Sequence, residues 1–389
     1  MNKIKRQAKF HNDSMRQVSH VHSYSFDKFL SQSNGNLLLN GGTKNKRREC
    51  LLRLIQEERA KSSETIIVFS DDKFFESELI SLAEAGKIGK LIVCSEEYPN
   101  YDFFYKMNKN LICEYFRRLA LEKGIRDTSE ISSYIGAFLT ILSQQSSINF
   151  SAMNYFARNT DTNIKDSTRD VQSADELIAS PRGSVTARSL MHEAYEALSP
   201  ITTSECSTGI CIGQLIEQDC VFLVNTPSYN DEFFALYFAM ELKALMNKSF
   251  MCIFDDTTFL NNETMRSVVN TMKQRQRVTV VISHENIVSV GDTESTLKNF
   301  NRDLILLDGN TPYVDLQYVI SSFGQYTHME PMANKSTPPR LFFTFYRGEG
   351  ESAVPYSRDR VILQEEYGNE ALLKVGSGSQ ILIAKRHLT

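Results

Sequence analysis

The chain has 389 residues, of which 41% are hydrophobic, so it can bury a large core without disulfides or metals. Its 43 Lys plus Arg and 47 Asp plus Glu give a net charge of −4, which excludes a strong overall attraction to nucleic acid or anionic lipid. Seven cysteines, an odd number with no C-x-x-C pair, favour a reducing cytosol.

The apolar runs have the length of strands, far below the ~20 residues of a membrane span. The start, MNKIKRQAKFHNDS, lacks the apolar segment of a signal peptide. We therefore expect a cytoplasmic protein that reaches the inner face of the membrane only through partners.

The first part of the chain predicts an arm followed by half of a sheet domain. Residues 1 to 35 are polar and basic without sustained periodicity, which predicts an N-terminal arm. From 36 to 99, strand patterns alternate with helical patterns, as in a mostly parallel sheet. The expected strands lie at 37–39, 65–69 and 91–94, and the expected helices at about 46–60 and 74–85.

The alternation stops at residue 100, and apolar residues then recur at helical spacing. This pattern predicts an all-α inserted domain at 100–205. The expected helices lie at about 108–123, 131–142 and 184–198, and the polar stretch 158–176 predicts a loop.

Alternation resumes at 206–389, which predicts the second half of the sheet domain. The expected strands lie at 220–224, 250–254, 278–282, 303–307, 313–316 and 381–383. The expected helices lie at about 231–247 and 263–275.

The stretch NLLLNGGTKNKRRECLL, residues 36 to 52, has the outline of a phosphate-binding loop between a strand and a helix. The signature G-x-x-x-x-G-K-[ST], begun at Gly41, needs Gly, Lys and a hydroxyl residue where the chain has Lys46, Arg47 and Arg48. Lys46 adds a side chain where the backbone must approach phosphate, and Arg47 lacks a compact ammonium group. Arg48 removes a metal ligand and adds a positive charge beside the metal position. At ~4 Å and an effective dielectric near 20, the repulsion between two unit charges costs about 4 kcal/mol.

An apolar strand ending in two acids, Asp255 and Asp256, provides the second half of a nucleotide motor site. In a RecA-like core the first carboxylate holds the magnesium shell, and the second, usually Glu, polarises the attacking water. Asp256 is one methylene shorter than that Glu. We expect this strand to lie next to the strand at 37–39, because ligand crevices form at the carboxyl ends of such strands.

In their shared order these segments resemble the type IV coupling proteins, the TraG/TraD-like ATPases of conjugative DNA transfer. SETIIVFSDDKFFESELISLAEAGKIGKLIVCSEE is similar to a family segment with an Asp-Pro-Lys-Gly turn, which Asp71 and Lys73 match and Asp72 and Phe74 do not. CVFLVNTPSYNDEFFALYFAMELKALMNKSFMCIFDDTTFL resembles the strand, helix and acidic strand of the family. RQRVTVVISHENIVSV resembles its sensor strand, with His284 in place of the usual Gln, and RVILQEEYGNEALLKVGSGSQILIAKR resembles its C-terminal segment.

The resemblance implies an α/β fold with a RecA-like P-loop NTPase core, in which the helical insertion takes the place of the all-α domain of the family. We expect no counterpart of the N-terminal membrane anchor of the family in this sequence. The implied nucleotide-site residues, in degenerate form, are Gly41, Gly42, Thr43, Lys46, Arg47, Arg48, Asp71 and Lys73. Asp255, Asp256 and His284 would be catalytic only in an active enzyme, and no metal site is predicted.

Three interpretations of the loop stay open: a structural relic, a loop that binds phosphate or nucleic acid without metal, and a working Mg-ATPase. We expect a catalytically degenerate adaptor or scaffold that uses neither ATP nor Mg²⁺. Its expected partners are type IV secretion or conjugation proteins, including an active coupling-protein paralogue, and any DNA binding should be weak and non-specific. The alternative is an active DNA-translocating ATPase, either a coupling protein or a FtsK/HerA-like motor.

Overall fold

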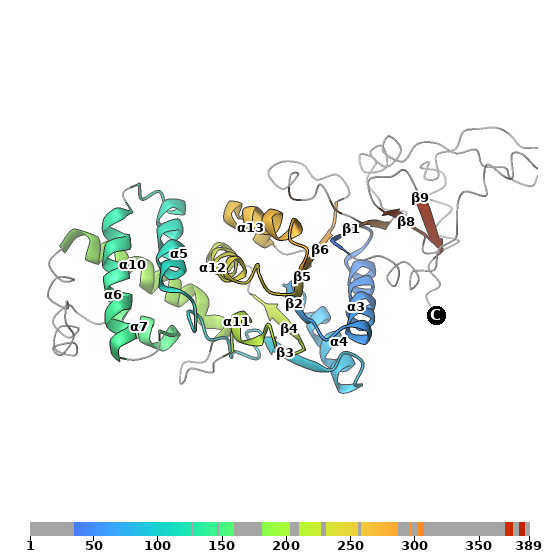
Figure 1. Cartoon of the computed structure of the whole chain (residues 1–389), viewed down its shortest axis with the longest axis horizontal. Coiled ribbons are helices and arrows are strands. Elements are labelled where there is room, and N and C mark those ends of the chain that lie inside the picture. The colour runs from blue at the N-terminus through green and yellow to red at the C-terminus, as the bar shows by residue number, and fades with distance from the viewer. Residues whose placement is uncertain are drawn as a thin grey trace, which may run out of the picture. The chain divides into compact units, whose positions relative to one another are not determined.

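The computed structural model describes residues 35–126, 128–145, 148–158, 181–202, 210–226, 231–255, 258–286, 302–306, 370–375 and 381–385, with Thr296 and Phe300 (Figure 1). Nearly all of the predicted arm at 1–35 and loop at 158–176 lies outside these residues. So do the predicted strand at 313–316 and Asp256.

The described strands form one sheet in the order β3-β4-β2-β5-β6-β1-β7-β8-β9. Seven of them are parallel, which confirms the predicted α/β class: β1 (Leu37–Gly41), β2 (Thr65–Ser70), β3 (Lys90–Cys94), β4 (Cys220–Asn225), β5 (Phe250–Asp255), β6 (Val278–His284) and β7 (Arg302–Leu306). β8 (Glu370–Val375), which the sequence did not predict, pairs antiparallel with β7, and β9 (Ile381–Lys385) pairs antiparallel with β8.

The acidic strand β5 does not lie next to β1, as the sequence predicted, because β6 lies between them in the sheet order. The apolar pattern of a parallel strand shows that both of its faces are covered, but it carries no information about which strand is its neighbour.

The described chain divides into two compact units. The smaller one holds β1, the start of α3 (Lys44–Lys61) and β7 to β9. All five positions of β1 are buried, and β1 pairs with β7 in the register Leu37 with Arg302. Arg302 is also buried, and its Nη2 donates to the Gly35 carbonyl at 2.6 Å.

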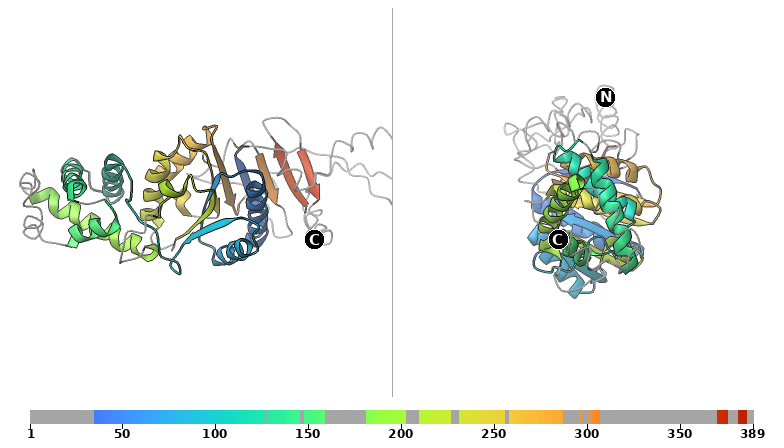
Figure 2. Two further views of the ribbon diagram at one scale, coloured as in Figure 1. Left: turned by 60° about the horizontal axis from the view of Figure 1, so that its bottom comes forward. Right: turned by 90° about the vertical axis from the view of Figure 1, so that its left-hand side faces the viewer.

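The larger unit contains β2 to β5, most of β6, and helices on both faces of these strands. α4 (Lys73–Glu84) covers one face, and α12 (Asp231–Ala244) and α13 (Glu263–Lys273) cover the other (Figures 1 and 2). Every residue of β2, β4 and β5 is buried, which explains their unbroken apolar runs.

Between β3 and Thr202 the described residues form helices that contact one another. Two of them, α5 and α10, also contact α12. They are α5 (Lys109–Glu122), α6 (Ser129–Gln145), α7 (Phe150–Arg158), α10 (Pro181–Leu198) and the short η1 (Ser199–Ile201). The sequence predicted three of them, whereas α7 was missed because it spans only two to three turns.

The connections into and out of these helices lie side by side. The Tyr101 N–H donates to the Ile201 carbonyl at 2.9 Å, and the Asp102 N–H donates to the Ile210 carbonyl at 2.8 Å. The incoming connection turns sharply at Phe104, whose φ of 64° is left-handed. The backbone N–H of Phe104 donates to the Tyr237 hydroxyl at 2.9 Å, which anchors this turn to α12.

Candidate functional site

The turn after β1 is shorter than the phosphate-loop signature requires. Because α3 begins at Lys44, and not at 46 as predicted, only Gly42 and Thr43 separate it from β1. Thr43 explains the earlier start, since its Oγ1 accepts from the Lys46 N–H at 3.4 Å, as a helix-capping residue does. The first turn of α3 therefore includes Lys46, which the signature places in the loop.

Gly42 is fixed by two constraints in the smaller unit. Its φ of 65° lies in the left-handed region. A Cβ at this position would lie 2.8 Å from the Cβ of Leu306 in β7, closer than side-chain carbons approach one another. The turn therefore requires glycine whether or not a ligand binds there.

Arg47 is turned back onto this turn. Although arginine is usually exposed, Arg47 is only 2% exposed. Its Nη1 donates to the Gly42 carbonyl at 2.7 Å and to the Gly41 carbonyl at 3.1 Å. A phosphate loop presents backbone N–H groups to its anion, whereas here the two glycines present carbonyl oxygens to a cation.

The neighbouring Arg48 behaves differently. Its Nη2 donates to the Asn45 Oδ1 at 3.1 Å, in an exposed contact within the first turn of α3. The residue at the position of the metal-binding hydroxyl is thus a half-buried cation.

Two buried polar atoms near the ends of β1 and β6 have no hydrogen-bond partner among the described residues. They are Oδ1 of Asn40 and Oγ of Ser283, in residues that are 6% and 2% exposed. An unsatisfied buried polar atom costs about 1–3 kcal/mol, so such atoms commonly bind water.

In the larger unit, Asp255 ends β5 opposite Ser70 of β2. Asp255 is 1% exposed, and its Oδ2 accepts from the Ser70 hydroxyl at 3.0 Å. The Ser70 oxygen in turn accepts from the Asp72 N–H at 3.1 Å, which links the acidic strand to the start of α4.

The turn residues that match the coupling-protein pattern are not the ones near Asp255. Asp71 and Lys73 are exposed, and Lys73 forms an exposed ion pair with Glu97 at 3.6 Å. Asp72, which departs from the pattern, is buried, and its Oδ1 caps α4 by accepting from the Phe74 N–H at 3.0 Å. Sequence reasoning could not tell which of two adjacent aspartates turns inward.

A second buried carboxylate, Glu76, was also missed. Its Oε2 accepts from the Asn225 side-chain amide at 2.7 Å, and its Oε1 accepts from the Ser95 hydroxyl at 3.1 Å. Asn225 ends β4 and Ser95 directly follows β3, so β2 to β5 all have buried polar side chains at or directly after their carboxyl ends. The sequence did contain a signal for these buried polar side chains, because a polar residue ends or directly follows the apolar run of each of these strands.

His284 lies at the end of β6 and is half-buried. Its Nδ1 accepts from the Asn286 N–H at 3.1 Å, within a local turn. Among the described residues, no group of three or more His, Cys, Asp or Glu side chains could hold a metal ion. In that same part of the chain, no helix is both long and apolar enough to cross a membrane.

The mostly parallel sheet, with a glycine turn after β1 and an acidic residue ending β5, confirms the predicted α/β fold. The chain is similar to the bacterial conjugative coupling protein TrwBdeltaN70 in complex with sulphate, with 10% identity, a TM-score of 0.58, and coverage of 95% of this chain and 94% of that one.

Two further solved structures are similar. VirB4 of Thermoanaerobacter pseudethanolicus has 12% identity and a TM-score of 0.51, and the match covers 93% of this chain and 91% of that one. TrwB in complex with the non-hydrolysable GTP analogue GDPNP has 11% identity and a TM-score of 0.54, covering 91% and 86%. No protein-family model and no curated protein matches the chain. At these identities the likeness establishes the fold.

Proposed function

We propose that this chain is a catalytically degenerate, coupling-protein-like adaptor or scaffold in a conjugative DNA transfer or type IV secretion system. The likeness in fold to a conjugative coupling protein over 95% of the chain supports the setting. The degenerate character rests on the turn between β1 and α3.

The observation that carries the proposal is the position of Arg47. Its guanidinium bonds to the carbonyls of both glycines of the turn. Hydrogen bonds to charged groups contribute roughly 1.5–3 kcal/mol each, so phosphate binding would first have to overcome two of them. It would also have to unwind the first turn of α3, because that turn takes up residues of the loop.

The metal position supports the same conclusion. Magnesium in nucleotide sites is held by oxygen ligands and substrate phosphates. Arg48 provides a cation there instead of an oxygen, and Asp255 already accepts a hydrogen bond from Ser70. The loop therefore lacks an oxygen ligand that the chemistry needs.

Calorimetric titration of the full chain with MgATP tests the proposal. We expect no binding at roughly millimolar MgATP, and no thermal shift, because a ligand stabilises a protein only in proportion to its occupancy. The combined variant Lys46→Gly, Arg47→Lys, Arg48→Thr should gain measurable binding without hydrolysis. Arg53→Thr, which changes an arginine further along α3, is the matched control and should gain none.

An active DNA-translocating ATPase is the competing function, because TrwB, which shares the fold, has been solved with GDPNP. Micromolar MgATP affinity of the unmodified chain, with turnover that Asp255→Asn abolishes, would establish the enzyme and refute the scaffold. Under the scaffold proposal, a pull-down from the native host should instead recover type IV secretion or conjugation proteins, including an active coupling-protein paralogue.

A further inference from the structure

β3 is the first strand in the sheet order, so within the described sheet it pairs with β4 alone. Whereas β2, β4 and β5 are buried throughout, Lys90 of β3 is exposed and its next three residues are half-buried. An edge strand of this kind offers backbone N–H and C=O groups to another chain.

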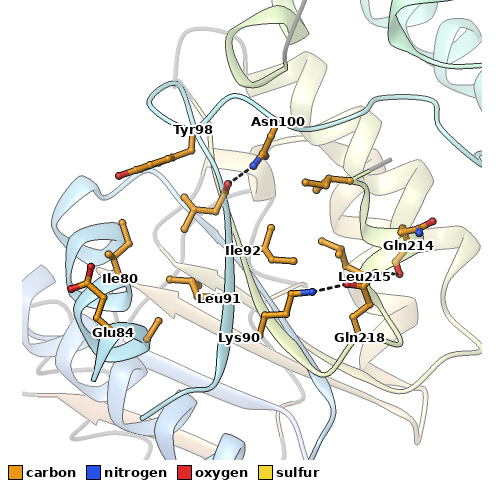
Figure 3. A pocket seen from close by; sticks show the side chains of 13 residues that line it. Ile80, Glu84, Lys90, Leu91, Ile92, Tyr98, Asn100, Gln214, Leu215 and Gln218 are labelled. Atoms are coloured by element: carbon orange, nitrogen blue, oxygen red, sulfur yellow. Dashed lines mark hydrogen bonds between the residues drawn. The ribbon is translucent and has the colours of Figure 1, made fainter. Parts of the chain in front are cut away.

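A groove of about 700 Å³ follows this edge (Figure 3). Apolar side chains lie on both sides of the strand: Leu91 is on the side of Ile80 of α4, and Ile92 is on the side of Leu215, at the end of α11 (Ile212–Leu215). The rim is polar, with Lys90 Nζ donating to the Gln218 Oε1 at 2.9 Å.

A side-chain hydrogen bond to β3 shows which of its backbone groups face the groove. The Asn100 side-chain amide donates to the Val93 carbonyl at 3.2 Å, as the backbone of a neighbouring strand would. The Val93 carbonyl therefore points away from β4. Because backbone groups of alternate residues point to the same side of a strand, Leu91 presents its N–H and C=O to the groove as well.

The size of the groove fits a short strand. A strand residue advances about 3.3 Å, neighbouring strands lie about 4.8 Å apart and packed layers about 10 Å apart, so one residue fills ~160 Å³. The groove therefore holds about four residues. A contact of that size is far below the roughly 20–30 residues a side of a stable dimer interface, which argues for a peptide segment and against a second copy of this chain.

We propose that the β3 edge is a docking site for an extended segment of a partner protein, about four residues long, which adds to the sheet as a further strand. Since the groove has apolar walls on both sides of β3, successive side chains of the segment are apolar, Val or Ile in preference because they suit a strand. This interaction is independent of the turn at Arg47, so it holds for either function considered above.

The test uses fluorescein-labelled peptides that carry four-residue Val and Ile segments between terminal lysines, with fluorescence anisotropy as the readout on the full chain. We expect saturable binding below roughly 1 mM, and none for the same peptides with Pro at the second apolar position, because Pro cannot donate to a strand. Amide exchange should slow at Leu91 on binding.

Two variants localise the site. Ile80→Lys places a charge in one wall and should weaken binding by about tenfold or more, whereas the control Ser81→Lys, on the exposed side of α4, should not. Leu91→Pro should abolish binding, since proline removes the outward N–H that an edge strand can spare. If Leu91→Pro fails to fold, Ile80→Lys and the exchange at Leu91 decide.

The proposal is wrong if none of the peptides binds, or if binding survives Ile80→Lys with exchange at Leu91 unchanged. A dimer of the full chain in sedimentation, dissociated by Ile80→Lys, would also overturn it, by identifying a second copy as the occupant.

Discussion

Glu241 of α12 provides the sharpest test of the packing in the larger unit. It is 5% exposed, and its carboxylate accepts from the Tyr101 hydroxyl and, at 3.2 Å, from the Gly213 N–H. Burial raises the pKa of Glu241 from an ordinary value of 4.5 to about 7, although the bond from Tyr101 opposes the rise. Its two donors lie on the connections between the sheet and the helices, because Tyr101 lies between β3 and α5 and Gly213 lies between η1 and β4.

The shift predicts the direction of a pH effect. The folded state holds the Glu241 proton more tightly than the unfolded state, so the contribution to stability is complete below pH 4.5 and is lost as the pH rises to about 7. At 1.36 kcal/mol per pKa unit, the loss above pH 7 is about 3 kcal/mol. The neighbouring Tyr237 and Cys211 do not contribute, because burial raises the pKa of Tyr237 well above its usual range and that of Cys211 to about 12.

Glu241→Gln should remove this pH dependence, because the amide stays neutral at every pH. Urea unfolding at about pH 5 and about pH 8 measures it, and amide exchange at Gly213 reports on the larger unit alone. We expect the wild type to lose about 2.5 kcal/mol over this interval and Glu241→Gln to lose much less. Glu232→Gln, at the exposed start of α12, is the control and should keep the wild-type slope. An equal slope in Glu241→Gln and wild type would refute the reasoning.

Three further predictions concern the basic turn and DNA. Arg47→Ala should destabilise the protein by about 2–4 kcal/mol in urea unfolding, because two carbonyls lose a charged donor, whereas Arg48→Ala should cost below about 1 kcal/mol; equal effects would contradict the geometry. Gly42→Ala should cost more than Gly86→Ala, since both glycines have left-handed φ but only Gly42 lacks room for a Cβ, and equal melting temperatures would show that the turn relaxes. Deleting residues 1 to 20 should weaken binding to duplex DNA and flatten its salt dependence in anisotropy titrations, and tight binding at physiological salt after the deletion would place the DNA surface elsewhere.

The strands were the most predictable part of the fold. Runs such as CVFLV and FMCIF are apolar at every position, which only a strand covered on both faces accommodates at that length. Their order could not be predicted, because pairing depends on the faces of several helices at once. The antiparallel β8 was missed as well, since the segment EALLKV alternates polar and apolar residues only imperfectly.

The candidate site was predicted as a set of residues but not as a geometry. An arginine in the first turn of a helix is expected to be solvated, so the burial of Arg47 follows only from the position of the two glycine carbonyls. The start of α3 at Lys44 likewise depends on Thr43, a cap that the signature treats as any residue. Local hydrogen bonds determine both the burial of Arg47 and the start of α3. The phosphate-loop signature specifies only residue types and their spacing, so it cannot predict these bonds.

The buried polar groups of each unit bear on the proposal that the chain binds no nucleotide. Polar side chains at the carboxyl ends of parallel strands are ordinarily satisfied in part by a ligand, and without one they carry a desolvation cost. In the larger unit this cost is offset internally: Ser70 donates to Asp255, and Ser95 and Asn225 donate to Glu76. In the smaller unit, Arg47 donates to the carbonyls of the turn, whereas Oδ1 of Asn40 and Oγ of Ser283 have no hydrogen-bond partner among the described residues. Replacing Ser70 or Asn225 by alanine should therefore destabilise the chain equally with and without MgATP, whereas in a working motor added nucleotide would restore part of the loss.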